Sequence, residues 1–394
     1  MRILFCNYEY PPLGGGGGVV MAAMAREIAR RHEVTVLTSR AGDLPAESLE
    51  GDVRVVRVPV LFRRDLATAN LASMAAYLPM GLRRGLALGR EQSFDIVNTH
   101  FVVPTGPLGH VLARGMRVPN VLSVHGGDLF DPSKRMSPHR HVALRVAVAA
   151  MLRRADAVVA QSQDTAVNVS SIYGVQRIVD LVPLGIDRPP AGVRCNRASL
   201  SIPDDAFAMV TIGRVVPRKA TTQLVRVLAD LGPKAWLIVV GDGPDAGAVR
   251  QAARELGVGD RVRLLGFVTE AEKHRALAAA DLFVSTSQHE GFGLVFLEAM
   301  AFGLPVVCYN RGGQVDYLST PATGAVVRLN DVAAFTAAVR ELRDAPELRA
   351  TIRARNLAKV ESYFIDRCAQ AYESIFERTL LEHSRHLTAA LPRH

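Results

Sequence analysis

Short apolar runs rich in β-branched residues alternate with longer helical patterns along nearly the whole sequence. This alternation is typical of parallel sheets whose strands are joined by covering helices. In the first half of the chain, the candidate strands are residues 3–6, 34–37, 53–58, 96–98, 121–124, 157–160 and 178–182. In the second half, they are residues 209–212, 237–240, 262–264, 282–285, 305–308 and 325–327. We therefore expect an α/β protein built on two parallel sheets.

The boundary between the two halves is expected at residues 187–192, where two prolines and a glycine interrupt every hydrophobic period. A chain of 394 residues is too long for one comfortable core, which also favours two domains. We place an N-terminal domain at residues 1–190 and a C-terminal domain at residues 203–371. The helical patterns between the strands include residues 21–31, 221–231, 246–256 and 369–382.

A run of glycines, Gly14 to Gly18, follows the first candidate strand. Glycines at that point let backbone N–H groups approach a phosphate, with the positive end of the next helix behind them. A dinucleotide-binding motif would need a glycine in place of Val19 and an acidic residue at the end of the second strand, which reads Thr38-Ser39-Arg40. A nicotinamide cofactor is therefore not expected, and a phosphate loop and a plain tight turn both stay open.

Two further segments carry opposite charges beside strand ends. One candidate strand leads into Gly213 and Arg214 and then Lys219, and the segment 289–298 holds Glu290 in front of a Gly-Phe-Gly turn. Carboxylates bind hydroxyl groups, whereas guanidinium and ammonium groups bind phosphates. Together the two segments predict a pocket for a sugar attached to a diphosphate.

These segments, in this order, resemble the retaining glycosyltransferases with the GT-B fold, family 4, also called glycosyl transferases group 1. The resemblance covers nearly the whole chain. It includes two further elements, Val182-Pro183-Leu184-Gly185-Ile186-Asp187 before the linker and Val240-Gly241-Asp242-Gly243-Pro244 in the second half. It implies two Rossmann-like parallel-sheet domains that face each other across a cleft, with a C-terminal helix, about 372–394, that packs back on the N-terminal, acceptor-side domain.

The resemblance also implies an enzyme that moves a sugar from a nucleotide diphosphate sugar to an acceptor hydroxyl with retention of configuration. Its catalytic residues would be His125, Arg214, Lys219 and Glu290. The donor would be bound by Gly15, Gly16, Gly213, Gly291, Phe292, Gly293, Leu294 and Glu298. The acceptor would meet Tyr10, His100 and Asp128.

In such an enzyme Arg214 and Lys219 would neutralise the departing diphosphate, while Glu290 would bind sugar hydroxyls and Glu298 the ribose. A carboxylate at the position of Glu290 could instead serve only to start a helix. The family usually has a glycine after the lysine, and Ala220 stands there in this chain. A single histidine is more often structural than functional, but His125 directly follows a strand and precedes two glycines, which favours a role at the strand edge.

Neither a metal nor a cofactor is expected. The sequence contains no Asp-x-Asp, because Asp242-Gly243-Pro244-Asp245 has one residue too many, and a metal-bridged diphosphate therefore lacks obvious ligands. The four cysteines show neither zinc spacing nor a close pair, which favours a reducing, cytoplasmic compartment. They are Cys6, Cys195, Cys308 and Cys368.

The net charge of +9 is unevenly distributed: between Arg54 and Arg90 there are seven arginines and one acidic residue, Asp65. This stretch is either a solvated basic face or a surface for an anionic membrane, so a peripheral place at the inner face of the membrane is an alternative to a purely cytoplasmic one. Pro79 and Gly81 argue against one continuous amphipathic helix there. No apolar stretch reaches the roughly 18 residues that span a bilayer.

Two other classes of protein remain alternatives. One is an enzyme of the same fold with different chemistry, a sugar phosphorylase or a nucleotide-sugar epimerase. The other is a non-catalytic, basic nucleotide-binding module. Nucleic acid is not an expected partner, because no aromatic residues are interleaved with the arginines. The expected partners are a nucleotide sugar and a small-molecule, glycan or lipid-linked acceptor, and the base, the sugar and the acceptor stay open.

Overall fold

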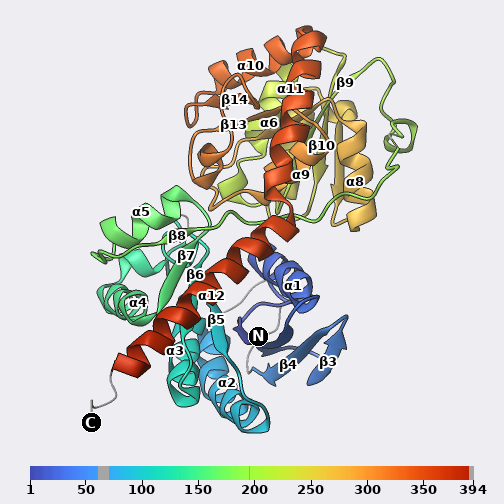
Figure 1. Ribbon diagram of the computed structural model, residues 1–394. Helices are drawn as coiled ribbons and strands as arrows, with labels where there is room; N and C mark the ends of the chain where they lie inside the picture. Colours follow the sequence, from blue (N-terminus) through green and yellow to red (C-terminus); the bar gives the residue numbers. More distant parts are fainter. Residues whose placement is uncertain (61–70, 133, 195, 390–394) are drawn as a thin grey trace, which may run out of the picture. The chain divides into compact units, whose positions relative to one another are not determined.

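The computed structural model describes residues 1–60, 71–132, 134–194 and 196–389, and the chain divides into two compact α/β units (Figure 1). The first unit comprises residues 1–187 and 364–394, and the second comprises residues 188–363. The chain leaves the first unit inside the proline-rich segment and re-enters it at Phe364, upstream of the residue at which the sequence analysis began the final helix.

The first unit is built on an eight-stranded sheet with the order β3-β4-β2-β1-β5-β6-β7-β8. All neighbouring strands are parallel except β3 and β4, which are antiparallel. The strands are β1 Arg2–Cys6, β2 Glu33–Arg40, β3 Glu47–Glu50, β4 Val53–Pro59, β5 Ile96–His100, β6 Asn120–Val124, β7 Ala157–Ala160 and β8 Asp180–Leu181. The apolar side chains of the strands between the two edge strands β3 and β8 are almost fully buried, as in a sheet with helices on both faces.

The helices of the first unit include both early and late parts of the sequence. The long C-terminal helix α12 packs beside α1, and α2 packs beside α3. The helices are α1 Gly16–Ala29, α2 Leu71–Glu91, α3 Thr105–Met116, the short η1 Pro138–Arg140, α4 Val142–Arg154, α5 Gln163–Ser171 and α12 Ile365–Ala389. The helix α1 thus starts inside the glycine run, earlier than the hydrophobic pattern predicts.

The helix α2 is continuous, which corrects the expectation that Pro79 and Gly81 would interrupt it. A β-carbon at Gly81 would lie 2.7 Å from Leu108 Cδ2 of α3, and one at Gly85 would lie 2.6 Å from Leu112 Cδ1. These glycines therefore serve close packing of two helices, a use that overrides their low helix propensity. Residues 61–70 of the predicted basic stretch lie outside the described residues.

The second unit contains a six-stranded, fully parallel sheet with the order β11-β10-β9-β12-β13-β14. Its strands are β9 Phe207–Ile212, β10 Ala235–Val240, β11 Val262–Gly266, β12 Leu282–Ser285, β13 Val306–Tyr309 and β14 Gly324–Val327. Its α-helices are α6 Thr222–Asp230, α7 Ala246–Glu255, α8 Glu270–Ala279, α9 Leu294–Ala301, α10 Val332–Asp344 and α11 Pro346–Val360. Short 3₁₀ turns are η2 Ala198–Leu200, η3 Pro217–Lys219, η4 Gly259–Arg261, η5 Gly313–Asp316 and η6 Glu361–Tyr363.

Two strands differ from the sequence prediction. The edge strand β3 was not predicted, because its residues Glu-Ser-Leu-Glu lack the apolar run that marks the other strands. Its pairing is stabilised by Arg57 of β4, which donates to Ser48 Oγ at 2.7 Å and binds Glu50. The strand β8 is only two residues long, shorter than the predicted residues 178–182.

Candidate functional site

The strand order reverses once in each sheet, beside residues that the sequence analysis selected. In the first sheet β1 lies between β2 and β5, and in the second sheet β9 lies between β10 and β12. At such a reversal the connections leave in opposite directions, and ligands of open α/β sheets bind in the crevice at the carboxyl ends of the strands. His100 ends β5, while Lys219 follows β9 and Glu290 follows β12. The topology supplies one candidate binding edge in each unit.

In the second unit, Glu290 is bound by two cations. Its Oε1 accepts a hydrogen bond from Lys219 Nζ, and its Oε2 lies 3.5 Å from Arg218 Nη1. Glu290 is 7% exposed, and burial alone would raise its pKa. Lys219 and Arg218 outweigh burial and lower the pKa to about 2, so the carboxylate is ionised at neutral pH. Arg218 was assigned no role from the sequence, and only its pairing across the sheet edge identifies it.

The backbone of Glu290 is fixed by a neighbouring loop. The Glu290 N–H donates to the Arg311 carbonyl oxygen at 3.2 Å, and the Gly313 N–H donates to the Glu290 carbonyl oxygen at 2.9 Å. Between them, Gly312 has φ +115°, and a β-carbon there would overlap the Glu290 carbonyl group. Only glycine allows two backbone segments to approach this closely. The loop therefore sets the position from which the Glu290 side chain meets its two cations.

Glu298 lies one helix turn and more beyond the start of α9. Its Oε1 accepts a hydrogen bond of 2.9 Å from Lys273 Nζ on α8, and Lys273 also pairs with Glu270 at 2.8 Å. Its Oε2 is buried and has no hydrogen-bond partner among the residues that the structure describes. A carboxylate oxygen in this state is an acceptor for a ligand hydroxyl. No local pattern in the sequence points to Lys273, because α8 and α9 are separated by β12 and a loop.

The turn that starts α9 is held from behind by one side chain. Gly293, with φ +87°, is the N-cap residue of α9, and the Phe292 ring packs against Tyr317 at 5.1 Å between ring centroids. The Tyr317 hydroxyl lies 2.8 Å from the carbonyl oxygens of both Phe292 and Gly293. The Phe292 side chain is thus part of the core. What the segment 291–294 can offer a ligand is its backbone N–H groups at a helix N-terminus.

Arg214 differs from Lys219 in its surroundings. Its side chain is exposed, and it directly follows Gly213, whose φ of +143° turns the chain at the end of β9. A β-carbon at Gly213 would lie 3.2 Å from Lys219 Cε, so the turn brings the two cationic segments together. Ala220, next to Lys219, has φ +47°, in the left-handed region that favours glycine. The backbone geometry explains why the resembled family usually has a glycine there.

In the first unit, the glycine run is partly loop and partly helix. Gly15 is the N-cap residue of α1, and its N–H donates to Glu9 Oε2 at 3.1 Å. A β-carbon at Gly17 would overlap the Phe101 ring, whereas one at Gly15 would meet nothing within 4 Å. The glycine run therefore has a packing role at Gly17, while Gly15 and Gly16 are exposed at the positive end of a 14-residue helix.

The two predicted histidines of the first unit contact each other. His100 Nδ1 lies 2.9 Å from His125 Nε2, and His100 Nε2 lies 2.7 Å from Asn98 Oδ1. The His125 ring stacks on Phe101 at 4.3 Å between centroids. Burial lowers the pKa of His125 to about 4 and that of His100 well below its ordinary value, so both rings are neutral at pH 7. The structure thus joins the proposed catalytic histidine to a residue predicted for the acceptor.

The other two residues predicted for the acceptor are buried. Asp128 accepts hydrogen bonds from the backbone N–H groups of Val102 at 2.7 Å and His125 at 2.8 Å, one with each carboxylate oxygen. Burial raises the pKa of Asp128 to about 6, although these two bonds oppose the change. Its geometry supports a role in holding the loop of His125. Tyr10 is 1% exposed and packs near Arg57, whose guanidinium carbon lies 5.8 Å from the ring centroid.

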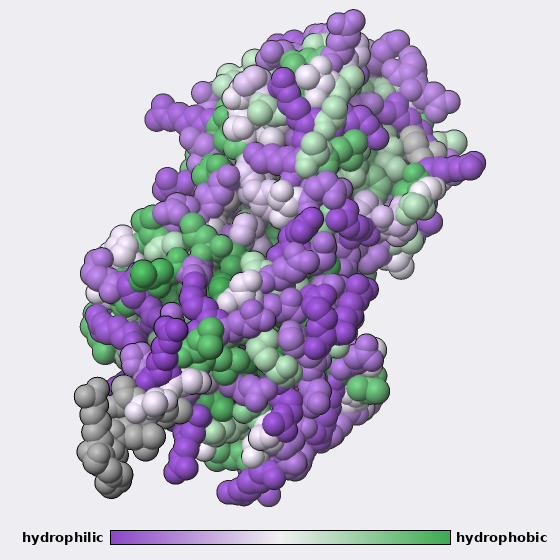
Figure 2. Space-filling view, in the orientation of Figure 1, coloured by the Kyte–Doolittle hydropathy of each residue, from purple (hydrophilic) through white to green (hydrophobic). Residues whose placement is uncertain are grey.

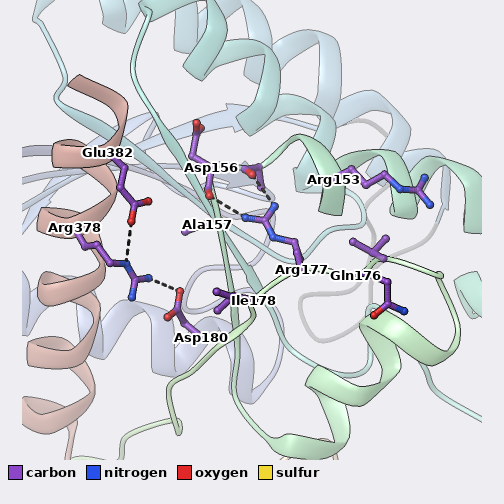
Figure 3. Close-up of a pocket in the computed structure, with 11 residues that line it drawn as sticks. Arg153, Asp156, Ala157, Gln176, Arg177, Ile178, Asp180, Arg378 and Glu382 are labelled. Carbon is purple, nitrogen blue, oxygen red and sulfur yellow. Dashed lines mark hydrogen bonds and ion pairs between the residues drawn. The ribbon is translucent and has the colours of Figure 1, made fainter. Parts of the chain in front are cut away.

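A cavity of about 680 Å³ lies elsewhere in the first unit, at the amino ends of β7 and β8 (Figure 3). Arg378 of α12 reaches Asp180 Oδ2 at 2.6 Å in its wall. Arg177 donates to the carbonyl oxygens of Ala155, at 2.8 Å, and of Asp156, at 2.9 Å. These arginines are engaged in attaching α12 and the β8 segment to the sheet, at the edge opposite to the carboxyl ends of the strands. The cavity contains none of the predicted site residues.

Three of the five described arginines of the basic stretch are paired with glutamates. Arg54 and Arg84 both bind Glu47 and Glu91, which lie just outside the stretch, and Arg57 binds Glu50. Some of the exposed apolar side chains of this unit gather on α4 and α5 and in or beside β8 (Figure 2), namely Val142, Val146, Val167, Ile178 and Leu181, and Met80 of α2 is also exposed.

Within the described ranges, no helix is long and apolar enough to cross a membrane. The same residues contain no group of three or more histidine, cysteine, aspartate or glutamate side chains placed to hold a metal ion. Cys6, Cys308 and Cys368 are buried free thiols, and Cys195 lies outside the described residues.

Comparison with known families and proteins gives one consistent assignment. Residues 14–188 match the model of Glycosyltransferase Family 4, and residues 194–358 match that of Glycosyl transferases group 1. The 2-deoxystreptamine N-acetyl-D-glucosaminyltransferase of Streptomyces fradiae is 30% identical over 91% of this chain and 90% of its own length. The D-inositol 3-phosphate glycosyltransferase of Kineococcus radiotolerans is 28% identical over 93% of this chain and 91% of its own length.

A solved structure shows the same fold. HepE from Anabaena, in complex with UDP, matches 96% of this chain and all of its own with a TM-score of 0.78 and 21% sequence identity. The two parallel α/β units are thus the two Rossmann-like units of the GT-B fold. Together with the matched family models and the relative at 30% identity, this shows that the chain belongs to the group 1 glycosyltransferases and is a glycosyltransferase.

Proposed function

We propose that this glycosyltransferase moves a sugar from a nucleotide diphosphate sugar to an acceptor hydroxyl with retention of configuration, without a metal or resident cofactor. The observation that carries the proposal is the cluster of Lys219, Arg218 and Glu290 at the strand-order reversal of the second sheet. A diphosphate needs cations at the point where its bond to the sugar breaks, because negative charge builds up on the leaving oxygen.

The charges of this cluster suit that ligand. The cluster itself has two positive charges, Arg218 and Lys219, and one negative charge, Glu290, and Arg214 in the same loop adds a third positive charge, so that two positive charges are left for a diphosphate. Arg214 is exposed and ready to move onto a phosphate, whereas Lys219 is held by Glu290. The N–H groups at the start of α9 add the positive end of a helix dipole. Cationic side chains and backbone dipoles would thereby take the part that a metal ion plays in other transferases.

The carboxylates supply the hydroxyl contacts that the proposal needs. Glu290 stays ionised because its pKa is about 2, so both its oxygens can only accept hydrogen bonds. Glu298 keeps one buried oxygen without a partner among the described residues, which suits a ribose hydroxyl. In the first unit, the neutral His125 would meet a further hydroxyl of the substrates, and Gly15 and Gly16 would present N–H groups to a phosphate.

For the acceptor, we propose a cyclitol, that is, a hydroxylated six-membered carbocycle, either free or as part of a lipid. Two relatives that match more than nine-tenths of this chain are named for such acceptors, D-inositol 3-phosphate and 2-deoxystreptamine. Both rings carry a row of hydroxyl groups around a rigid frame. The free form is favoured, because three of the five described arginines of the basic stretch, Arg54, Arg57 and Arg84, are paired with glutamates.

We place the enzyme in a reducing compartment, the cytoplasm, with a peripheral position at the membrane required only if the cyclitol is lipid-linked. The three described cysteines are buried free thiols in support of this.

A donor screen tests the proposal first. The thermal midpoint is measured with UDP-, GDP- and ADP-linked sugars, for the native chain and for Glu290→Gln, since a ligand that binds only the folded state raises the midpoint. The donor that shifts the native chain is then incubated with myo-inositol, inositol phosphate, 2-deoxystreptamine and vesicles containing phosphatidylinositol. The product's anomeric configuration is read by NMR.

Transfer to a free cyclitol with the anomeric configuration of the donor supports the proposal, and transfer only on vesicles selects the lipid-linked form. Inversion would contradict retention, and release of a sugar phosphate from the donor with inorganic phosphate would indicate a phosphorylase. Binding of nucleotides with no preference for the sugar and no transfer to any acceptor would leave the nucleotide-binding module as the better description.

A further inference from the structure

We infer that Asn98 and His100 are positioning residues that hold His125 in the neutral tautomer with a hydrogen on Nε2 and a free lone pair on Nδ1. The inference concerns a chain of hydrogen bonds inside the first unit, which runs from the backbone of β6 through Asn98 and His100 to His125. The use of the Nδ1 lone pair on a substrate hydroxyl rests on the proposed function, whereas the tautomer itself does not.

The direction of the chain is set by a backbone carbonyl. Asn98 Nδ2 lies 2.9 Å from the Val121 carbonyl oxygen and 3.1 Å from Ser123 Oγ. A carbonyl oxygen can only accept, so the amide nitrogen of Asn98 must face it and the amide oxygen must face His100. Because that oxygen also only accepts, His100 Nε2, 2.7 Å away, carries the hydrogen.

The protonation of His100 determines which nitrogen of His125 carries the hydrogen. The His100 ring is 1% exposed and stacks near Phe5 at 5.8 Å and Tyr372 at 6.2 Å between centroids, surroundings that disfavour a charged imidazolium. A neutral His100 with its hydrogen on Nε2 has a lone pair on Nδ1. His125 Nε2, 2.9 Å from this lone pair, must therefore be the donor. A neutral His125 then has its own lone pair on Nδ1.

This last nitrogen is the unusual one. His125 Nδ1 is buried, yet no hydrogen-bond partner lies near it among the described residues. A buried acceptor without a partner costs free energy, and such groups in native proteins generally have a reason. A flip that exchanged the two ring nitrogens would lose the contact between Nε2 and His100 Nδ1, while the stack on Phe101 holds the plane of the ring and the bond from the His125 N–H to Asp128 holds its backbone. A ligand hydroxyl that donates to Nδ1 would complete the chain.

Phe101, whose ring stacks on His125, has a strained backbone. Its φ is +64°, a left-handed conformation that is unfavourable for a residue with a β-carbon. The conformation places the ring on His125, and the absence of a side chain at Gly17 leaves space for it. Phe101 and the space left at Gly17 thus help to hold the orientation of the His125 ring.

Nitrogen-15 NMR of the full-length chain labelled in histidine tests the tautomer directly. Signals are assigned by comparison with His100→Gln and His125→Gln. We expect the Nδ1 of His125 to show the shift of an unprotonated ring nitrogen and its Nε2 that of a protonated one at pH 7. A protonated Nδ1, or a rapid average of the two tautomers, would overturn the inference, whatever the activity of the enzyme.

Asn98→Leu tests the cause. Without the amide oxygen, His100 can place its hydrogen on Nδ1 and donate to His125, which then carries its hydrogen on Nδ1. The two His125 signals should exchange character or average. The matched control is Thr99→Val, which removes the buried 2.7 Å hydrogen bond from Thr99 Oγ1 to Asn120 Oδ1 on the same strand. The control should leave the His125 signals in place, and an equal change in both variants would indicate a general disturbance of β5.

Kinetics then connect the tautomer to transfer. Asn98→Leu should lower kcat by roughly 10- to 100-fold, the order of loss found when the outer hydrogen-bond partners of metal-ligating histidines are removed, with a smaller change in the KM of the donor. Thr99→Val should keep kcat within about 3-fold of the native value. A native kcat in Asn98→Leu despite a changed tautomer would show that Nδ1 serves no step. If no donor supports transfer at all, the proposed function fails, while the NMR result still decides the tautomer.

Discussion

Gly312 lies against Glu290 so closely that the two residues share a bridge between their backbones, and a β-carbon at Gly312 would occupy the space of the Glu290 carbonyl group. The carboxylate that is expected to bind the sugar is therefore placed by backbone contacts with a neighbouring loop. Glycine is required at position 312 by both its φ of +115° and this contact.

Gly312→Ala should destabilise the protein by about 3 kcal/mol, because the overlap involves backbone atoms that cannot rotate away. It should also weaken nucleotide binding, since Glu290 shifts relative to Lys219. Gly247→Ala is the control, because a β-carbon in that position of α7 meets nothing within 4 Å. This change should stabilise the chain by about 0.5–1 kcal/mol. Denaturant unfolding measures both, and equal effects would contradict the assignment of Gly312.

Ala220→Gly should stabilise the protein by about 0.5–1 kcal/mol. Ala220 has φ +47° and ψ +37°, a conformation that costs a residue with a β-carbon about 1–2 kcal/mol. Glycine would relieve this strain, but it also increases the conformational entropy of the unfolded chain, which cancels part of the gain in stability. The free energy of unfolding is measured in denaturant. A loss of stability would mean that the methyl group makes favourable contacts that outweigh the strain.

The pH dependence of stability should report the state of Glu290. Its pKa is about 2 in the folded chain and 4.5 in the unfolded chain, so the folded state binds its proton less well. The resulting stability is fully present above pH 4.5 and is lost as pH falls towards 2, by about 1.4 kcal/mol per pH unit between the two values. The difference in unfolding free energy between the native chain and Glu290→Gln should therefore narrow from pH 5 to pH 3. A constant difference would show that Glu290 is not held as an ion.

Substitution of the two cations after β9 should separate ligand binding from folding. Arg214→Gln should weaken nucleoside diphosphate binding by about 10- to 100-fold while changing stability by less than about 0.5 kcal/mol, because its side chain is exposed. Lys219→Gln should weaken nucleoside diphosphate binding and also lower the free energy of unfolding by about 3 kcal/mol, because it leaves the buried Glu290 with only Arg218 as a cationic partner. Calorimetric titration and denaturant unfolding provide the two readouts. Equal stability losses would show that Arg214 has a structural partner.

Most strands were predictable because parallel sheets bury their strands on both faces, so that each strand appears as a continuous apolar run. The sequence could also bring Lys219 and Glu290 to one edge, since each lies in the loop that follows such a run. The strand β3 could not be predicted, because it consists mainly of polar residues. Its pairing with β4 is stabilised by the side chain of Arg57, which binds Ser48 and Glu50.

Other features depend on contacts that no local pattern records. Arg218 and Lys273 gain their importance from carboxylates far along the chain, and the bond between His100 and His125 depends on the register of β5 and β6. The expectation that Pro79 and Gly81 would interrupt α2 was wrong for a similar reason. From the sequence alone, Gly81 is read as a helix breaker. In the structure, the absence of a side chain at Gly81 leaves space for Leu108 of the neighbouring helix.

The chain's return to the first unit through α12 has a consequence for how the protein is made. Tyr372 and Phe376 of this helix are almost fully buried, and the Tyr372 hydroxyl bonds Ser123 Oγ at 3.0 Å in the middle of the first sheet. During synthesis, the core of the first unit therefore cannot be completed until residues 364–394 have been translated. By then all residues of the second unit, 188–363, have already been made. A premature stop codon shortly before residue 364 would consequently damage the beginning of the molecule rather than its end.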